Sequence, residues 1–221
     1  MRNEMKYKVH HLFPVRFWTF HASEELTADT LEKVKSLEFR SYNEPYGVGT
    51  SDQLHSRPEF RDIHEWFQQC VDQVHRDNGW HCDRLVVNKS WANRADAKSG
   101  HHHSAHRHPM SYLSGIFYLT DGSPSVFLDP IRDREWGQFY LEGGPASENR
   151  QFVHPGAGGL VLFPSYMLHG SVENEEDIDR FTIAINTFPS GVINEFTWGE
   201  IERPMAEVSV NGWTQLDSLD L

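Results

Sequence analysis

The 221-residue chain is poor in cysteine, in long apolar runs and in positive charge. Its two cysteines, Cys70 and Cys82, are too few for a disulfide framework and favour a reducing compartment. No stretch is apolar for long enough to be a signal peptide or a membrane span, so we expect a cytoplasmic protein without a membrane partner. The 20 Lys and Arg residues against 32 Asp and Glu residues give a net charge of -12, which argues against nucleic acid as a partner.

Length and composition bound the architecture. With 221 residues, 38% of them hydrophobic, the chain can build one full core, and it shows neither an internal repeat nor an obvious linker. We therefore expect a single domain over residues 1–221. Residues 1–80 are predicted to form an arm and helices that support a sheet, residues 83–190 the β core, and residues 191–221 a C-terminal tail. The tail is expected to add an edge strand or a homodimer contact.

Two helices are predicted in the N-terminal part. Ser23 is a suitable N-cap, two glutamates follow it, and apolar residues at helical spacing extend to about Phe39. A second helix is predicted from Pro58 to about Asn78, where an Asn-Gly pair indicates a stop. Residues 41–57 are rich in turn formers and are expected to form a loop, long enough to cover an active site.

From residue 83 the apolar pattern changes from helical to alternating. Strands at short spacing, separated by Gly, Pro and Asp turns, predict an all-β sandwich or jelly roll with the two helices packed outside. Residues 130–150 are predicted to be an insertion suited to substrate selection, and residues 173–179 a solvated acidic loop. The predicted strands are Val9 to Phe20, Leu85 to Asn93, Tyr112 to Leu119, Ser125 to Leu128, Gln151 to His154, Gly159 to Phe163, His169 to Val172 and Arg180 to Phe188.

Five of the 14 histidines lie within eight residues, at the start of the stretch that leads into the predicted strand Tyr112 to Leu119. In an extended chain His106 and His108 point to the same face, so their imidazoles can converge on one metal ion. His169 follows an apolar strand and a proline turn, and it is the candidate third ligand. Five further histidines are expected to be solvated: the run His101 to His103, and His64 and His75 of the second helix.

Five short motifs follow one another along the β core. They are Trp91-Ala92-Asn93, His106-Arg107-His108-Pro109, Ser114-Gly115-Ile116-Phe117-Tyr118, Phe163-Pro164-Ser165-Tyr166-Met167-Leu168-His169 and Arg180-Phe181-Thr182-Ile183-Ala184-Ile185-Asn186. In this order they resemble the iron(II)/2-oxoglutarate-dependent dioxygenases. More narrowly, the chain is similar to a little-characterised bacterial and phage branch with an HxH, H and RxT pattern, related to the prolyl-hydroxylase-like members. The resemblance covers roughly residues 85–190 and implies a double-stranded β-helix, the jelly roll that cupins also have.

The resemblance implies an Fe(II) centre held by His106, His108 and His169. Three protein ligands on one side of the ion leave open positions for 2-oxoglutarate and O2. The implied reaction hydroxylates a substrate, either a small molecule or a protein, and releases succinate and CO2. No catalytic residue is implied beyond the metal centre.

The resemblance also implies a pocket for 2-oxoglutarate. Arg180 is the implied anchor of its distal carboxylate, because a planar guanidinium can form two parallel hydrogen bonds with a carboxylate. Thr182 lies two residues on and therefore on the same strand face. Tyr118 stands where prolyl-hydroxylase-like members place a tyrosine hydroxyl on the same carboxylate, and Asn93 approaches the metal-bound end of the co-substrate.

One position departs from the superfamily pattern. Most members have an acidic residue where this chain has His108, so the implied ligand set is neutral, with Asp129 as an alternative source of a carboxylate. Three histidines also suit zinc, which outcompetes ferrous iron at such ligands. Two other functions therefore stay open. One is a three-histidine cupin-like metalloprotein, either a 2-oxoglutarate-independent dioxygenase or a metal-binding sensor, and the other is an interaction module with a vestigial zinc site.

Overall fold

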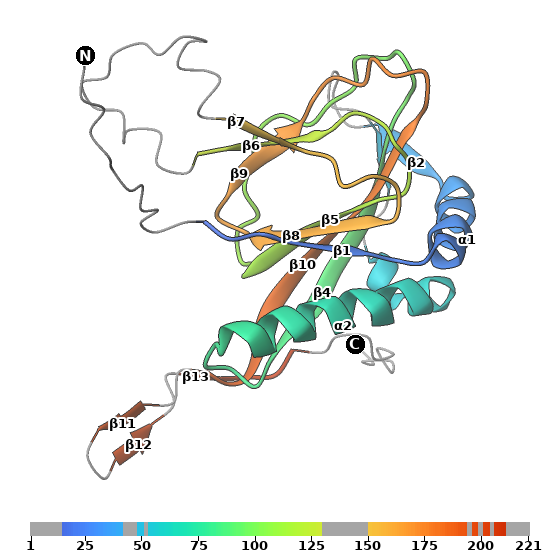
Figure 1. Cartoon of the computed structure of the whole chain (residues 1–221). Coiled ribbons are helices and arrows are strands. Elements are labelled where there is room, and N and C mark those ends of the chain that lie inside the picture. The colour runs from blue at the N-terminus through green and yellow to red at the C-terminus, as the bar shows by residue number, and fades with distance from the viewer. Residues whose placement is uncertain are drawn as a thin grey trace, which may run out of the picture.

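The β core consists of two antiparallel sheets, with helices on the outer side of the larger one (Figure 1). This arrangement confirms the predicted jelly roll with two helices packed outside. The computed structural model describes residues 15–41, 48–50, 53–129, 150–193, 196–198, 201–203 and 206–210. The N-terminal part of the first predicted strand and nearly all of the predicted insertion at 130–150 lie outside these ranges.

The larger sheet has the strand order β1-β8-β5-β10-β4-β3-β2, and β13 pairs with β10 beyond this row. Its strands are β1 (Trp18–His21), β8 (Gly159–Pro164), β5 (Leu113–Tyr118), β10 (Arg180–Ile193), β4 (Arg84–Ala95), β3 (Val48–Thr50), β2 (Phe39–Ser41) and β13 (Ala206–Val208). The smaller sheet has the order β7-β6-β9, with β7 (Arg150–Val153), β6 (Ser125–Leu128) and β9 (Leu168–Ser171). A separate hairpin joins β11 (Phe196–Trp198) to β12 (Ile201–Arg203).

The two helices begin and end as their sequences predict, within a few residues. The helix α1 (Glu24–Lys35) is capped by Ser23, whose Oγ accepts a hydrogen bond from the backbone N of Leu26. The helix α2 (Arg61–Asn78) ends at Gly79, which has φ +60° and so adopts a left-handed conformation that glycine tolerates without strain. The 3-10 turns η1 (Leu54–Ser56) and η2 (Pro58–Phe60) precede α2. No helix in the described ranges is both long and apolar enough to cross a membrane.

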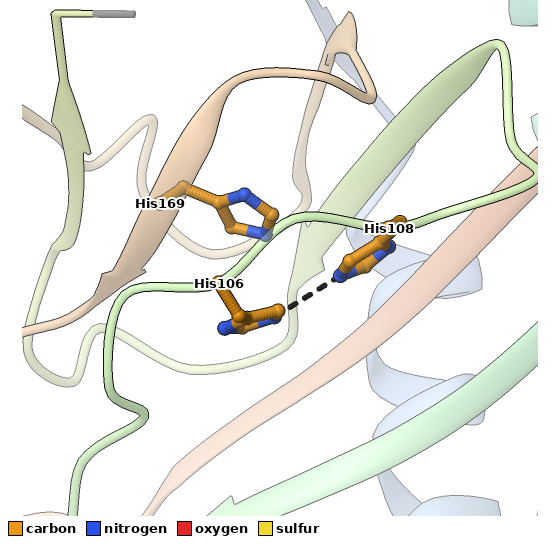
Figure 2. A group of neighbouring side chains, drawn as sticks. All are labelled: His106, His108 and His169. Carbon is orange, nitrogen blue, oxygen red and sulfur yellow. Dashed lines mark hydrogen bonds between the residues drawn. The ribbon is translucent and has the colours of Figure 1, made fainter.

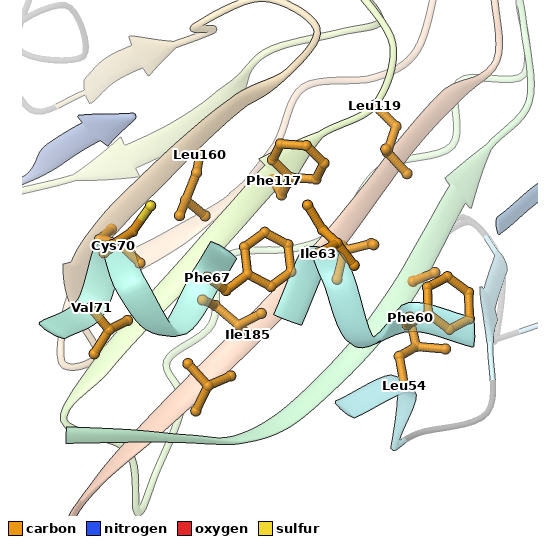
Figure 3. Close-up of a cluster of buried hydrophobic side chains, with 14 of the residues drawn as sticks. Leu54, Phe60, Ile63, Phe67, Cys70, Val71, Phe117, Leu119, Leu160 and Ile185 are labelled. Atoms are coloured by element: carbon orange, nitrogen blue, oxygen red, sulfur yellow. The ribbon is translucent and has the colours of Figure 1, made fainter. Parts of the chain in front are cut away.

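The larger sheet has two different faces, because successive side chains of a strand alternate. On its outer face, apolar residues of the central strands pack against α2, and Figure 3 shows them between helix and sheet. The residues in contact include Phe67 and Val71 of the helix and Phe117, Leu160 and Ile185 of the sheet. Burial of each such side chain contributes about 1.5–3 kcal/mol to stability. The inner face meets the smaller sheet through Ile116, Tyr118, Phe127, Val161 and Phe163.

The prediction of a loop over residues 41–57 is wrong in part. β2 and β3 form an antiparallel hairpin, and β3 continues the sheet by pairing Val48 with Arg94 and Gly49 with Asn93 of β4. Strands of three residues are too short to show an alternating pattern, so the sequence gives no periodic signal for them. Residues 42–47 and 51–52 lie outside the described ranges.

The tail prediction is confirmed in one respect, because β13 is an edge strand. It pairs with residues 191–193 of β10, and this pairing accompanies the extension of β10 beyond the predicted end at Phe188 to Ile193. The dimer contact stays a prediction.

The prediction of an exposed position for His64 is wrong. His64 lies on the same face of α2 as Phe67 and Val71, and only 2% of its surface is exposed. Its Nε2 lies 3.1 Å from the Oγ of Ser90 on β4. Burial is the main cause that lowers the pKa of His64 to about 3, and the nearby His55 adds to it. His75 is only partly buried, and its Nε2 lies 3.0 Å from the carbonyl oxygen of Cys82.

Candidate metal centre

His106, His108 and His169 lie together between the two sheets, as Figure 2 shows. His169 belongs to β9, and an isolated antiparallel bridge holds His106 beside it. The bridge has two backbone hydrogen bonds, from His106 N to His169 O (2.8 Å) and from His169 N to His106 O (3.0 Å). His108 follows two residues after His106 and turns to the same side. One ring nitrogen from each histidine lies within 4.8 Å of the others, so the structure brings together the three predicted ligands.

The ring orientation of each histidine is fixed by an oxygen atom next to its Nδ1. Carbonyl oxygens can only accept a hydrogen bond, so the Nδ1 atoms carry the hydrogen and the Nε2 atoms keep a free lone pair. This is the arrangement that metal-binding histidines require. The acceptors for His106, His169 and His108 are, in order, Ser104 O (2.8 Å), Met167 O (3.0 Å) and Asn186 Oδ1 (2.6 Å).

The Nε2 atoms of His106 and His108 lie 3.1 Å apart. With both hydrogens on Nδ1, two lone pairs face each other at this distance, and a cation between them removes the repulsion. Two nitrogens bound to one ion at about 2.1 Å, at about a right angle, would be separated by about 3 Å. The donor set therefore fits a divalent metal ion. Among the described residues the group contains no carboxylate, and Asp129 is not part of it.

Burial favours the neutral form of the His169 and His108 imidazoles. It is the largest cause that lowers the pKa of His169, to about 3, and the neighbouring histidines lower it further. The pKa of His108 is lowered by burial first, then by the charges of His106 and Lys89, against an opposing effect of the Asn186 hydrogen bond. Neutral imidazole is the form that binds a metal, so protons compete weakly for these two residues at pH 7.

A buried guanidinium lies in the same cavity as the histidines. Arg180 begins β10 and is 4% exposed. Its Nε donates to the carbonyl oxygen of Ser123 at 2.8 Å, and one terminal nitrogen donates to Ser125 Oγ at 3.2 Å. No Asp or Glu in the described part of the chain forms an ion pair with it. Burial lowers the pKa of Arg180, but arginine stays protonated in proteins. A buried charge without a counterion is costly, so the site favours an anionic ligand.

The other predicted co-substrate residues lie in one row across three strands. Thr182 of β10 is opposite Asn93 of β4 on one side and opposite Tyr118 of β5 on the other. Thr182 and Asn93 line the cavity together with Arg180. Tyr118 is fully buried behind them, where its hydroxyl donates to Ser125 Oγ and Val153 O. The Arg180 guanidinium lies 5.5 Å from the Tyr118 ring centre, so the Tyr118 ring packs against this cation.

Asn186 and His103 belong to the site, although the sequence assigned neither of them a role. Asn186 accepts hydrogen bonds from His108 and from Ser114 Oγ (2.9 Å), so its amide fixes the His108 ring. The alternation of side chains along a strand could have indicated Asn186, because positions 180, 182, 184 and 186 share one face. His103 was expected to be solvated, but it is mostly buried and lines the cavity beside Arg180. It lies there because the chain before His106 runs against Gly170, where a Cβ atom would clash with the carbonyl of His103.

The fold and the site thus define a jelly-roll protein with a facial cluster of three histidines and a buried cation beside it. Comparison with protein families gives the class. Residues 89–186, a little under half of the chain, match a family described as "Putative 2OG-Fe(II) oxygenase". The match begins at β4 and ends at Asn186, so it includes the histidine cluster and Arg180. No curated protein matches the chain in sequence.

Several solved structures share the fold at low sequence identity. The non-haem α-ketoglutarate-dependent carbocyclase SnoK from nogalamycin biosynthesis is 18% identical over 80% of this chain and 81% of that chain, with a TM-score of 0.59. HygX from Streptomyces hygroscopicus, with nickel and 2-oxoglutarate bound, is 12% identical over 90% and 92%, with a TM-score of 0.58. A Pseudomonas putida prolyl-4-hydroxylase is 13% identical over 80% and 94%, with a TM-score of 0.56.

The family match over residues 89–186 is to 2OG-Fe(II) oxygenases, which are oxidoreductases, and the solved structures that share the fold include enzymes of this kind. This confirms the resemblance seen in the motifs, and with it iron(II), 2-oxoglutarate and O2 as the cofactor and co-substrates of the class.

Proposed function

We propose that the protein hydroxylates a C–H bond of a small-molecule or protein substrate, with His106, His108 and His169 as iron ligands and Arg180 as the 2-oxoglutarate anchor. The observation that carries this proposal is the position of Arg180. A buried cation with no acidic partner in the described residues lines the same cavity as three converging Nε2 atoms. 2-Oxoglutarate has one end that chelates a metal and a second carboxylate that needs a cation, so it fits both halves of this cavity.

Bound iron(II) would supply O2 activation coupled to the decarboxylation of 2-oxoglutarate to succinate and CO2. The chain supplies orientation and shielding. Ser123 and Ser125 fix the Arg180 side chain, so its remaining N–H groups need little reorganisation to meet a carboxylate. Asn186 fixes the His108 ring, and the apolar cluster between the sheets keeps water away from the back of the His169 ring through Phe163.

The test is an anaerobic titration of Fe(II)-loaded protein with 2-oxoglutarate, followed through the weak visible charge-transfer band of a bidentate 2-oxoacid on ferrous iron. We expect a band in the wild type and no band in His108→Ala. In Arg180→Ala the dissociation constant of 2-oxoglutarate should rise by about 100-fold or more, because two charge-assisted hydrogen bonds are lost. Arg84→Ala is the matched control, since Arg84 is an exposed arginine paired with Asp72 outside the cavity.

Metal content and thermal unfolding of each variant separate a local effect from misfolding. A wild-type protein that holds iron but gives no band would contradict the 2-oxoglutarate assignment. It would then favour the three-histidine alternative, which the absence of a carboxylate from the described cluster supports.

We also infer a cytoplasmic location. Both cysteines support it, because Cys70 and Cys82 are free thiols in the structure, as is usual in a reducing compartment. Burial raises the pKa of the Cys70 thiol to about 12, which keeps that thiol unreactive.

A further inference from the structure

A groove of about 580 Å³ lies beside the histidine cluster, separate from the cavity around Arg180. His106 and His108 line both hollows, so a molecule in the groove would lie directly against the proposed metal position. The rest of its wall comes from β4, from Asn186 of β10 and from the segment that carries Arg107, Pro109 and Met110. The residues used below are Lys89, Trp91, Arg107 and Met110.

The charge of this groove is opposite to that of the molecule. The chain has a net charge of -12, yet the described groove lining contains two cations, Lys89 and Arg107, and no carboxylate. The Nε of Arg107 donates to the carbonyl oxygen of Tyr166 at 2.8 Å, which holds the guanidinium in place. A fixed guanidinium beside a metal centre is suited to hold a carboxylate, sulfonate or phosphate group.

The groove also has an apolar side. The Trp91 ring lies 5.4 Å from the His108 ring between centroids, and the Lys89 Nζ lies 5.5 Å from the Trp91 ring centre. Met110 is 81% exposed and has φ +59°, so a large apolar side chain is held in solvent on a backbone conformation that is rare for methionine. Both features fit a ligand that covers Trp91 and Met110 with an apolar part.

We propose that this groove binds the substrate to be oxidised, and that this substrate carries an anionic group next to an apolar or planar part. The anionic group meets Arg107, with Lys89 adding to the positive potential, and the apolar part lies on Trp91 and Met110 in front of the metal. The inference rests on the proposed function, because it takes the histidine cluster as the reaction centre.

The test uses a matched pair of probes on nickel-loaded protein saturated with 2-oxoglutarate, which occupies Arg180 and cannot turn over. Binding of 4-fluorobenzenesulfonate and of the neutral 4-fluorophenyl methyl sulfone is measured by fluorine NMR titration. We expect the sulfonate to bind about tenfold more tightly than the sulfone in the wild type. Arg107→Gln should remove most of this preference, Lys89→Gln a smaller part, and Arg107→Lys should keep part of it.

Arg76→Gln is the matched control, because Arg76 is an exposed cation on α2, on the opposite side of the sheet. It should leave the preference unchanged. Equal or absent binding of the two probes in the wild type would overturn the proposal, and so would a full preference in the Lys89→Gln/Arg107→Gln double variant. Loss of sulfonate binding in Arg180→Ala alone would place the probe in the co-substrate cavity and also overturn it. Failure of the proposed function would instead appear as a missing charge-transfer band in the iron protein, which this nickel experiment does not involve.

Discussion

Both faces of the larger sheet bury histidine, but the surroundings of the buried rings differ. On the outer face His64 lies among apolar side chains of α2, in edge contact with Phe67, and its Nε2 lies 3.1 Å from Ser90 Oγ of β4. On the inner face His169 and His108 lie among other imidazoles, with their Nε2 atoms turned to a common point.

Burial alone does not distinguish the two faces. His64 and His169 are 2% and 3% exposed, and burial lowers the pKa of both to about 3. A strongly lowered histidine pKa therefore does not mark a site in this molecule. What marks the site is convergence: several lone pairs aimed at one point, each ring fixed from behind by an oxygen acceptor.

The difference between the two faces is tested most directly by removing one histidine from each face. His169→Ala should weaken metal binding by more than about 100-fold, since losing a ligand costs more than losing a supporting hydrogen bond. His64→Leu should leave metal affinity and stoichiometry unchanged, although it changes stability. Calorimetric titration of the metal-free protein with Fe(II) or Ni(II) under argon measures both. Equal losses of affinity in the two variants would show that the rings are not functionally distinct.

A smaller effect is expected from the hydrogen-bond partners of the two rings. Asn186→Ala should lower metal affinity by about 10- to 100-fold, because His108 loses the acceptor that fixes its tautomer and orientation. Ser90→Ala removes a hydrogen-bond partner of His64 and should cost about 1 kcal/mol of stability without a change in metal affinity. The same titration, paired with urea unfolding, distinguishes the two outcomes. An unchanged affinity in Asn186→Ala would mean that the amide only fills space behind the ring.

The sequence predicted the inner face better than the outer one. Strand parity placed His106 with His108, and Arg180 with Thr182, because a two-residue period needs no tertiary information. The bridge that holds His106 beside His169 joins residues 63 positions apart, so only the motif resemblance indicated it. The burial of His64 follows from its helical spacing to Phe60, Phe67 and Val71, a signal that its polar side chain obscured.

Other features depended on the folded chain. The short β2–β3 hairpin has no periodicity to detect, and the groove at Arg107 forms only when β4 lies beside the segment after His108. A count of charges gave -12 for the whole molecule and therefore could not show a cationic groove beside the site.

A further expected effect concerns pH, and it isolates the outer face. The unfolded chain protonates His64 below about pH 6.5, whereas the native protein does not until about pH 3. The unfolded state then binds more protons, so stability falls as pH drops from 7 towards 4, by up to about 1.4 kcal/mol per pH unit for this residue. His55, whose ring centre is 6.4 Å away, adds to the effect when it is charged.

Urea unfolding of metal-free protein at pH 7, 6 and 5 should therefore give a shallower decline for His64→Leu than for the wild type. Phe67→Leu is the control, because it weakens the same packing without removing a titrating group, and its decline should run parallel to that of the wild type. Metal-free protein is needed because metal ligands release protons on binding, which would add a pH dependence from the inner face. Parallel declines in wild type and His64→Leu would mean that His64 gains a proton in the native state, and the outer face would then be less sealed from water than its packing indicates.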